Sequence, residues 1–289
     1  MPDLQILPPL FGYVAAGIIG AVIGSFLNVV IHRVPLEESI VFPNSSCPAC
    51  GAAISFYDNL PVISYLMLGA KCRSCKEHIS FRYPAVELLT ALLFVGVAWH
   101  DGLSAALAFD LVFVSALVAL VFIDAEHMLL PNVITYPGIV FALVARLLIP
   151  YLLGAPHFDD IPSLSQGALA HLPTPIVSLA GALIGALIGG GSLWLMGWTW
   201  EKLRGIEAMG LGDVKMMFMV GAYVGWRLTI LTIFVGVLSG SIIGILLMAR
   251  QREKNMQMLL PFGVFLGLGA VAALLFGAPL VEWYAGQFR

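Results

Sequence analysis

Long runs of apolar residues are the feature that most constrains the fold of this chain. About 20 consecutive apolar residues cross the hydrocarbon core of a bilayer as one α-helix, because the helix satisfies its own backbone hydrogen bonds there. The runs that we expect to cross a membrane are Phe11–Ile31, Ala85–Trp99, Leu103–Ile123, Val133–Leu153, Pro175–Met196, Val214–Trp226, Leu228–Met248 and Leu259–Pro279. The sequence therefore predicts an all-α polytopic membrane protein with about eight transmembrane helices, of which the second and sixth are short.

The composition agrees with this prediction and limits the partners. Only 11% of the residues are charged and 60% are hydrophobic, whereas about 25% of the residues of a soluble domain are charged. Membrane lipid is therefore the expected surrounding. The formal net charge is -3, and the sequence has no basic stripe of the kind that nucleic acid requires, so we expect no nucleic-acid partner.

The distribution of Lys and Arg predicts an orientation. With eight spans, both termini lie on the same side of the membrane. If that side is the outside, the inner loops hold eleven of the fourteen Lys and Arg residues, as cytoplasmic loops do. This orientation places both the polar segment 32–83 and the edges of the apolar runs that carry Asp124 and Asp213 on the cytoplasmic side.

Three segments differ in character. Residues 1–31 contain the first predicted transmembrane helix, residues 32–83 are polar and contain every cysteine, and residues 84–289 contain the other seven runs. We expect the middle segment to be a small cytoplasmic insert and the last to be a helical bundle with the reactive site. Glycines four residues apart, as in Gly181, Gly185 and Gly189, predict close helix packing in this bundle.

The insert contains two Cys-x-x-Cys pairs, Cys47 with Cys50 and Cys72 with Cys75, separated by twenty-one residues. This spacing is marginally longer than that of four-thiolate zinc sites, in which both sulfurs of each pair face one ion. Disulfide bonds are disfavoured in the reducing cytosol, and redox catalysis lacks the surrounding thioredoxin-like pattern. We expect a structural zinc ion, because an insert of about fifty residues has too small a core to fold unaided.

Two aspartates lie at edges of apolar runs, where a buried charge is costly and is usually kept for function. Asp124 directly follows the third run, and Asp213 follows Gly210-Leu211-Gly212 directly before the sixth. Two carboxyl groups within about 3 Å share one proton, so one can take a proton from water while the other gives one to the peptide. The pattern predicts that Asp124 and Asp213 are the catalytic pair of an aspartic peptidase.

The helix ends suggest how this pair divides its charge. Asp124 lies near a helix C-terminus, which disfavours a negative charge, and Asp213 lies near an N-terminus, which favours one. We therefore hypothesise that Asp124 holds the shared proton. For a single aspartate at such an edge, a solvated helix cap is an equally good interpretation, and we interpret Glu87 and Asp110 as structural.

An ion- or proton-coupled transporter is the alternative function, since aspartates at the membrane edge also carry ions. Transporter sites usually lie near the middle of the membrane, often between two repeated halves. Here both aspartates are expected at one face and no repeat is visible. The peptidase interpretation is therefore favoured.

Six motifs together resemble one known family, the bifunctional type IV prepilin peptidases, which are aspartic proteases of the Gly-x-Gly-Asp type. The motifs are Gly24-Ser25-Phe26-Leu27-Asn28-Val29-Val30, the two Cys-x-x-Cys pairs, Phe81-Arg82-Tyr83-Pro84-Ala85-Val86-Glu87-Leu88-Leu89, Phe122-Ile123-Asp124 with Leu130-Pro131-Asn132, Gly210-x-Gly212-Asp213-Val214-Lys215, and Pro261-Phe262-Gly263. Two positions depart from the family pattern: Glu126 stands where many members have Asp, and Val264 stands where Pro is common.

The resemblance implies a bacterial inner-membrane enzyme with two activities. It would cleave the leader peptide from type IV prepilins and type II secretion pseudopilins at the cytoplasmic face. It would then methylate the new N-terminal amine with S-adenosylmethionine. The methyltransferase half rests on the resemblance alone, because no glycine-rich fingerprint for an adenosyl cofactor is present. Its binding residues are not identified, and the insert 32–83 is the natural place to look.

Overall fold

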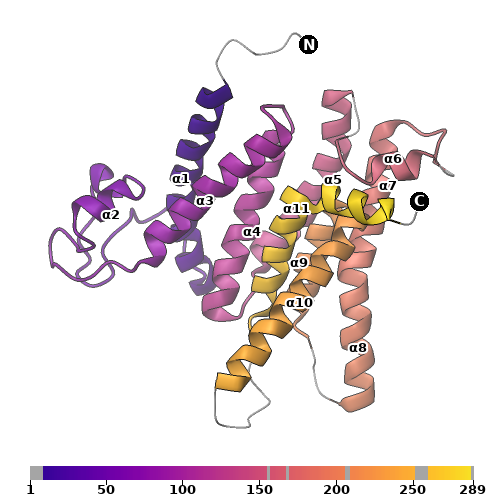
Figure 1. Cartoon of the computed structure of the whole chain (residues 1–289). Coiled ribbons are helices and arrows are strands. Elements are labelled where there is room, and N and C mark those ends of the chain that lie inside the picture. Colours follow the sequence, from indigo (N-terminus) through magenta and orange to yellow (C-terminus); the bar gives the residue numbers. More distant parts are fainter. Residues whose placement is uncertain (1–8, 155–156, 167–168, 206–208, 251–259, 288–289) are drawn as a thin grey trace. The chain divides into compact units, whose positions relative to one another are not determined.

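A computed structural model of the chain describes residues 9–154, 157–166, 169–205, 209–250 and 260–287. Within these residues the secondary structure is helical, without a strand. The chain divides into two compact units, unit 1 (Met1–Ala119) and unit 2 (Leu120–Arg289), and each is described by itself (Figure 1).

The elements of unit 1 are α1 (Pro9–Arg33), η1 (Val34–Leu36), η2 (Phe56–Asn59), α2 (Ile63–Met67), α3 (Arg82–Asp101) and the first part of α4 (Leu107–His127). Unit 2 contains the rest of α4 followed by α5 (Asn132–Leu153), α6 (Ile161–Ser165), α7 (Thr174–Ala186), η3 (Leu187–Gly191), α8 (Ser192–Arg204), α9 (Leu211–Val224), α10 (Trp226–Arg250) and α11 (Phe262–Gly286). Leu259, the first residue of the last expected span, lies outside the described residues.

Within the part of the chain that the structure describes, seven helices are long and apolar enough to cross a membrane. The prediction of an all-α polytopic membrane protein is thereby confirmed. The sixth expected run corresponds to α9, which has 14 residues and a length of about 21 Å at 1.5 Å per residue. This length is below the roughly 30 Å of a bilayer core, so α9 is not counted among the seven spans.

In unit 1, α1 packs closely against α3. A Cβ atom at Gly24 of α1 would lie 2.7 Å from the Cα atom of Glu87, so only glycine permits this approach. The side chain of Asn28 donates a hydrogen bond to the backbone oxygen of Tyr83 at 3.1 Å. These contacts fix the C-terminal half of α1 against the first turn of α3.

In unit 2, α9 is packed among α5, α7, η3, α10 and α11. Its side chains Met216, Met217 and Val220 are completely buried. The backbones of Gly221 in α9 and Gly185 in α7 lie so close that a side chain at either position would overlap the other helix. Helix α9 is therefore surrounded by protein and held by its neighbours.

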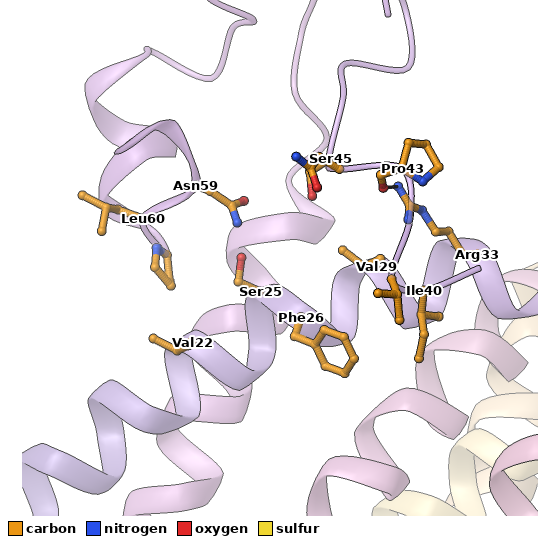
Figure 2. A pocket seen from close by; sticks show the side chains of 13 residues that line it. Val22, Ser25, Phe26, Val29, Arg33, Ile40, Pro43, Ser45, Asn59 and Leu60 are labelled. Carbon is orange, nitrogen blue, oxygen red and sulfur yellow. Dashed lines mark hydrogen bonds between the residues drawn. The ribbon is translucent and has the colours of Figure 1, made fainter. Parts of the chain in front are cut away.

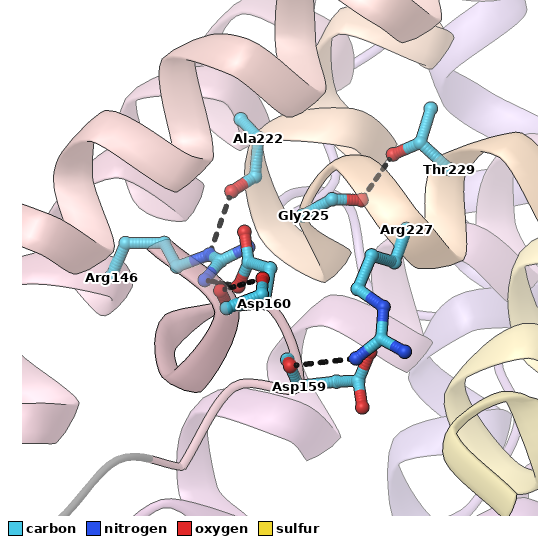
Figure 3. Close-up of polar contacts among 8 residues, drawn as sticks. Arg146, Asp159, Asp160, Ala222, Gly225, Arg227 and Thr229 are labelled. Carbon is cyan, nitrogen blue, oxygen red and sulfur yellow. Dashed lines mark hydrogen bonds and ion pairs between the residues drawn. The ribbon is translucent and has the colours of Figure 1, made fainter. Parts of the chain in front are cut away.

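The C-terminal end of α9 is held by a buried ion pair (Figure 3). Arg146 of α5 contacts Asp160 at 2.7 Å, with the two side chains 0% and 1% exposed. The guanidinium Nε of Arg146 also donates to the backbone oxygen of Ala222 at 3.2 Å. Because the backbone oxygen belongs to α9, the ion pair fixes this end of the helix, and Asp213 lies at the other end.

Candidate active site and metal centre

Asp124 lies in the last turn of α4 and is 5% exposed. Its Oδ2 atom accepts a hydrogen bond from the backbone N–H of Val264 at 3.0 Å. The neighbouring Gly263 leaves room for this carboxyl group, because a Cβ atom there would lie 2.8 Å from the same oxygen. The first turn of α11 therefore positions Asp124.

Asp213 is the third residue of α9, behind the N-cap residue Gly210. Burial, and after it the negative charge of Asp124, together raise the pKa of Asp213 to about 7. The two carboxyl groups are thus close enough to influence each other's ionisation. The structure brings the two sequence-predicted aspartates together in unit 2.

The segment between α4 and α5 joins the elements that carry the two aspartates. A Cβ atom on Gly212 would lie 3.0 Å from the Cβ of Leu130, and one on Gly263 would lie 3.0 Å from its Cδ1. Lys215 of α9 donates a hydrogen bond to the side chain of Asn132 at 2.8 Å. Leu130 therefore lies between the helix starts of α9 and α11, and Asn132 fixes α9 to α5.

Sequence reasoning alone did not identify the contacts of Val264, Lys215 and Asn132. One indication in the sequence that these residues matter is that they lie in or beside the motifs. Because Val264 lies 140 positions from Asp124 in sequence, no local pattern indicates that its backbone N–H contacts this carboxylate.

The four cysteines of the insert form one cluster, as their spacing predicts. Their Sγ atoms all lie within 4.8 Å of one another, and those of Cys47 and Cys75 are 3.8 Å apart. Four sulfurs at about 2.3 Å from a tetrahedral zinc ion are themselves about 3.8 Å apart. The cluster fits a metal ion of this kind.

The two Cys-x-x-Cys turns have matching backbones. The N–H of Gly51 donates to the oxygen of Cys47 at 2.8 Å, and the N–H of Lys76 donates to the oxygen of Cys72 at 3.1 Å. Gly51 and Lys76, which each follow the second cysteine of a pair, both have a positive φ, of 70° and 63°. The two turns thus present their sulfurs in the same way.

The thiols of the cluster have unequal acidities. Backbone N–H groups of Cys75 and Ser74 lower the pKa of Cys72 to about 6. The N–H of Glu77 lowers the pKa of Cys75, but partial desolvation and the neighbouring thiols outweigh it and raise that pKa to about 12. Four sulfurs this close cannot all ionise without a cation between them, so the donor set favours a bound metal ion.

Comparisons with known proteins match both parts of the chain. The family model described as "Bacterial Peptidase A24 N-terminal domain" matches residues 18–101. The model described as "Type IV leader peptidase family" matches residues 111–245, which include Asp124 and Asp213. None of the solved structures matches the chain.

Three curated relatives carry the name "Prepilin leader peptidase/N-methyltransferase". The one from Pseudomonas aeruginosa is 37% identical and covers 98% of this chain and 98% of its own length. The one from Myxococcus xanthus is 39% identical over 87% of this chain and 70% of its own length. The one from Aeromonas hydrophila is 34% identical over 92% of this chain and 91% of its own length.

Proposed function

Since this chain belongs to the type IV leader peptidase family and is a peptidase and N-methyltransferase, we propose that it processes prepilins. It cleaves the leader peptide from type IV prepilins and type II secretion pseudopilins. It then methylates the new N-terminal amine with S-adenosylmethionine as the methyl donor. The names of its relatives support the prepilin substrates.

Asp124 and Asp213 are the catalytic residues in this proposal. The observation that carries it is the placement of two carboxyl groups from α4 and α9 within mutual electrostatic influence. A pair of this kind hydrolyses a peptide without a covalent intermediate, because one group accepts a proton from the attacking water while the other protonates the carbonyl oxygen.

The contacts favour a division of charge opposite to that expected from the helix ends. An N–H donor stabilises the charged form of a carboxylate, and Asp124 accepts one from Val264. Asp213 has a pKa of about 7, raised by burial and then by the charge of Asp124. We therefore assign the negative charge, and the role of general base, to Asp124, and the shared proton to Asp213.

Cys47, Cys50, Cys72 and Cys75 hold a structural zinc ion in this proposal. Four thiolate ligands leave no open position on the metal for water or substrate. When bound, zinc supplies cross-linking between the two turns and no catalytic chemistry. The insert 32–83 is then a metal-stapled module between a first transmembrane helix in residues 1–31 and a bundle in residues 84–289.

The protein is a multi-pass membrane protein, and we place it in the bacterial inner membrane with its active face toward the cytoplasm. The concentration of Lys and Arg in the loops that eight spans place inside supports this orientation, in which α9 crosses the membrane as the sixth span. Its partners are then membrane lipid and the prepilin substrates, without nucleic acid. Membership of a peptidase family disfavours the transporter alternative.

The test is to incubate the purified protein with a prepilin, with and without S-adenosylmethionine, and to weigh the products by mass spectrometry. We expect leader loss without the donor and an additional methyl group with it. Asp124→Asn and Asp213→Asn should each abolish cleavage. An intact precursor with the wild-type protein would overturn the function, and cleavage by either variant would overturn the assigned site.

A further inference from the structure

Part of the insert in unit 1 lies beside helix α1 and not only beyond its end. A cavity of about 410 Å³ separates the two, and its lining on α1 runs from Val22 to Arg33. Figure 2 shows Leu60 of the insert toward the Val22 end of this cavity and Pro43 toward the Arg33 end. Val22 precedes Arg33 by eleven residues, which is about 16 Å along a helix. The segment around Leu60 therefore reaches back along the helix.

A hydrogen bond to α3 fixes the depth of this segment. The backbone N–H of Val62 donates to the side chain of Glu87 at 2.7 Å, and Glu87 is a buried residue five positions after the start of α3. The same carboxyl group hydrogen-bonds to the side chain of Ser25, eight positions before the end of α1. These positions lie about 8 and 12 Å inside the two helices.

Both helices are among those that are long and apolar enough to cross a membrane. Helix α3 has 20 residues and is therefore about 30 Å long, which equals the thickness of the hydrocarbon core. A backbone group that is held about 8 Å inside α3 consequently lies at the level of the bilayer. Val62 and the residues next to it are thus not in bulk water.

Helix α2, which directly follows Val62, has the reverse polarity of a helix on a protein surface in water. Ile63, Leu66 and Met67 share one face, at a spacing of three and four residues, and are 55%, 71% and 80% exposed. Ser64 is buried, and its hydroxyl donates to the backbone oxygen of Tyr57 at 3.1 Å. Because a surface helix in water buries its apolar stripe, this arrangement is one that lipid stabilises.

The backbone of α2 is also suited to a membrane interface. The N–H groups of Ser64, Leu66 and Leu68 donate to backbone oxygens of the same segment at 2.9 to 3.2 Å, and that of Val62 donates to Glu87. A backbone donor without a partner is costly where water is excluded. These four donors are satisfied without water, so this part of the segment can enter the bilayer at little cost.

We propose that residues 56–67 form a membrane-inserted edge of the insert, with Phe56 and the exposed face of α2 in the headgroup and upper acyl-chain region of the bilayer. Phe56 is 85% exposed and supplies an aromatic ring of the kind that is enriched at membrane interfaces. Lys71, which is exposed and lies four residues after Met67, supplies a cation that anionic headgroups attract.

The surface of α1 is the reason to choose lipid as the occupant and not another protein. Val22 and Phe26 of α1 are exposed and line the same cavity as the exposed Leu60. The apolar surface of a membrane span is thereby continuous with the membrane-inserted edge, and the bilayer that covers the span also covers the edge. The cysteine cluster is then held close to the membrane surface by lipid as well as by the two connections of the insert.

The experiment uses the wild-type full-length protein in vesicles of phosphatidylethanolamine and phosphatidylglycerol. The vesicles contain a phospholipid with a diazirine group in the upper part of its acyl chain, and peptide mapping by mass spectrometry locates the lipid adducts after illumination. We expect residues 56–67 to be labelled within threefold of the exposed face of α1, which includes Val14 and Ile18. Labelling of α1 together with unlabelled residues 56–67 would overturn the proposal.

A photo-reactive side chain tests the contact at a single position. Met67→p-benzoylphenylalanine should cross-link to lipid in these vesicles. The matched control is Glu77→p-benzoylphenylalanine at an exposed, charged position of the same insert, which we expect in water and without lipid adducts. The content of bound metal, compared with that of the wild type, checks that the insert of each variant is folded. Equal lipid cross-linking from the two positions would overturn the proposal, and so would a cross-link from position 67 to a second copy of the chain or to an added prepilin in place of lipid.

Discussion

The carboxyl group of Asp124 differs from that of an ordinary helix-end aspartate because a backbone N–H from the start of α11 donates to it. Asp213 differs for another reason: burial, and then the charge of Asp124, raise its pKa to about 7. In the proposed assignment, two chemically identical residues have different tasks because their surroundings differ. From the helix ends and the apolar neighbours alone, the sequence indicates the opposite preference, with the shared proton on Asp124.

The first residue-scale prediction concerns pH. Because the folded-state pKa of Asp213 is raised from an ordinary value of 3.8 to about 7, its protonated form persists up to neutral pH and is lost as pH rises through 7. Cleavage should therefore decline along a basic limb with an apparent pKa of about 7, measured as kcat/KM on a prepilin peptide from pH 5 to 9. A rate that stays constant from pH 6 to pH 9 would contradict the assignment.

The second residue-scale prediction concerns Val264, whose backbone N–H donates to Asp124. Proline fits the first turn of a helix but lacks an N–H. Val264→Pro should remove the hydrogen bond to Asp124 without unfolding α11. Because a hydrogen bond to a charged group contributes about 1.5–3 kcal/mol, the acidic limb of cleavage should move up by about one to two pH units.

The matched control is Val264→Ala, which keeps the backbone N–H and should leave the acidic limb unchanged. A shift of equal size in both variants would show that the side chain of Val264, and not the hydrogen bond, determines the pH at which the acidic limb falls.

At the scale of elements, α9 organises unit 2. Its start carries Asp213, its side is packed against the glycines of α7 and η3, and its end is held by Arg146 and Asp160. The sequence indicated a short apolar run there, but not that the run is enclosed by other helices. Glycine spacing predicted close packing in general, whereas the particular pair Gly185 and Gly221 depends on how the chain folds back.

Asp160 and Asp159 allow a prediction at this scale (Figure 3). Removing one partner of a buried ion pair leaves an uncompensated charge and costs about 3–5 kcal/mol. Asp160→Asn should therefore lower the free energy of unfolding in detergent by that amount. Asp159→Asn breaks the less buried pair with Arg227, 3.1 Å apart, and should cost less, because the 22% exposed Arg227 side chain stays partly solvated. Equal effects of the two substitutions would contradict the role given to the buried pair.

At the scale of the whole molecule, the catalytic pair and the cysteine cluster belong to different units. Unit 2 contains the aspartates, and unit 1 contains the cysteine cluster. The membrane class and the cysteine cluster were predictable from sequence, because apolar length and Cys-x-x-Cys spacing are local patterns. The hydrogen bond from Val264 to Asp124 was not, since 140 positions separate the two residues in sequence.

Metal removal tests this division. After treatment with a zinc chelator, amide hydrogen exchange in residues 40–80 should accelerate at least tenfold, because a small insert loses its main cross-link. Exchange in α9 and cleavage of the prepilin should not change. Cys72→Ser protein should behave like the chelated wild type and respond no further to chelator. Unchanged exchange in the insert after complete metal removal would show that metal does not stabilise it.

The most direct test of the catalytic pair is the titration of Asp213 itself, followed by carboxyl infrared spectroscopy of isotope-labelled protein. Asp124→Asn removes the negative charge that contributes to the raised pKa of Asp213. We predict that Asp213 then ionises at a clearly lower pH than in the wild-type protein, although burial keeps its pKa above 3.8. An identical titration of Asp213 in the two proteins would contradict the claim that these carboxyl groups act as one pair.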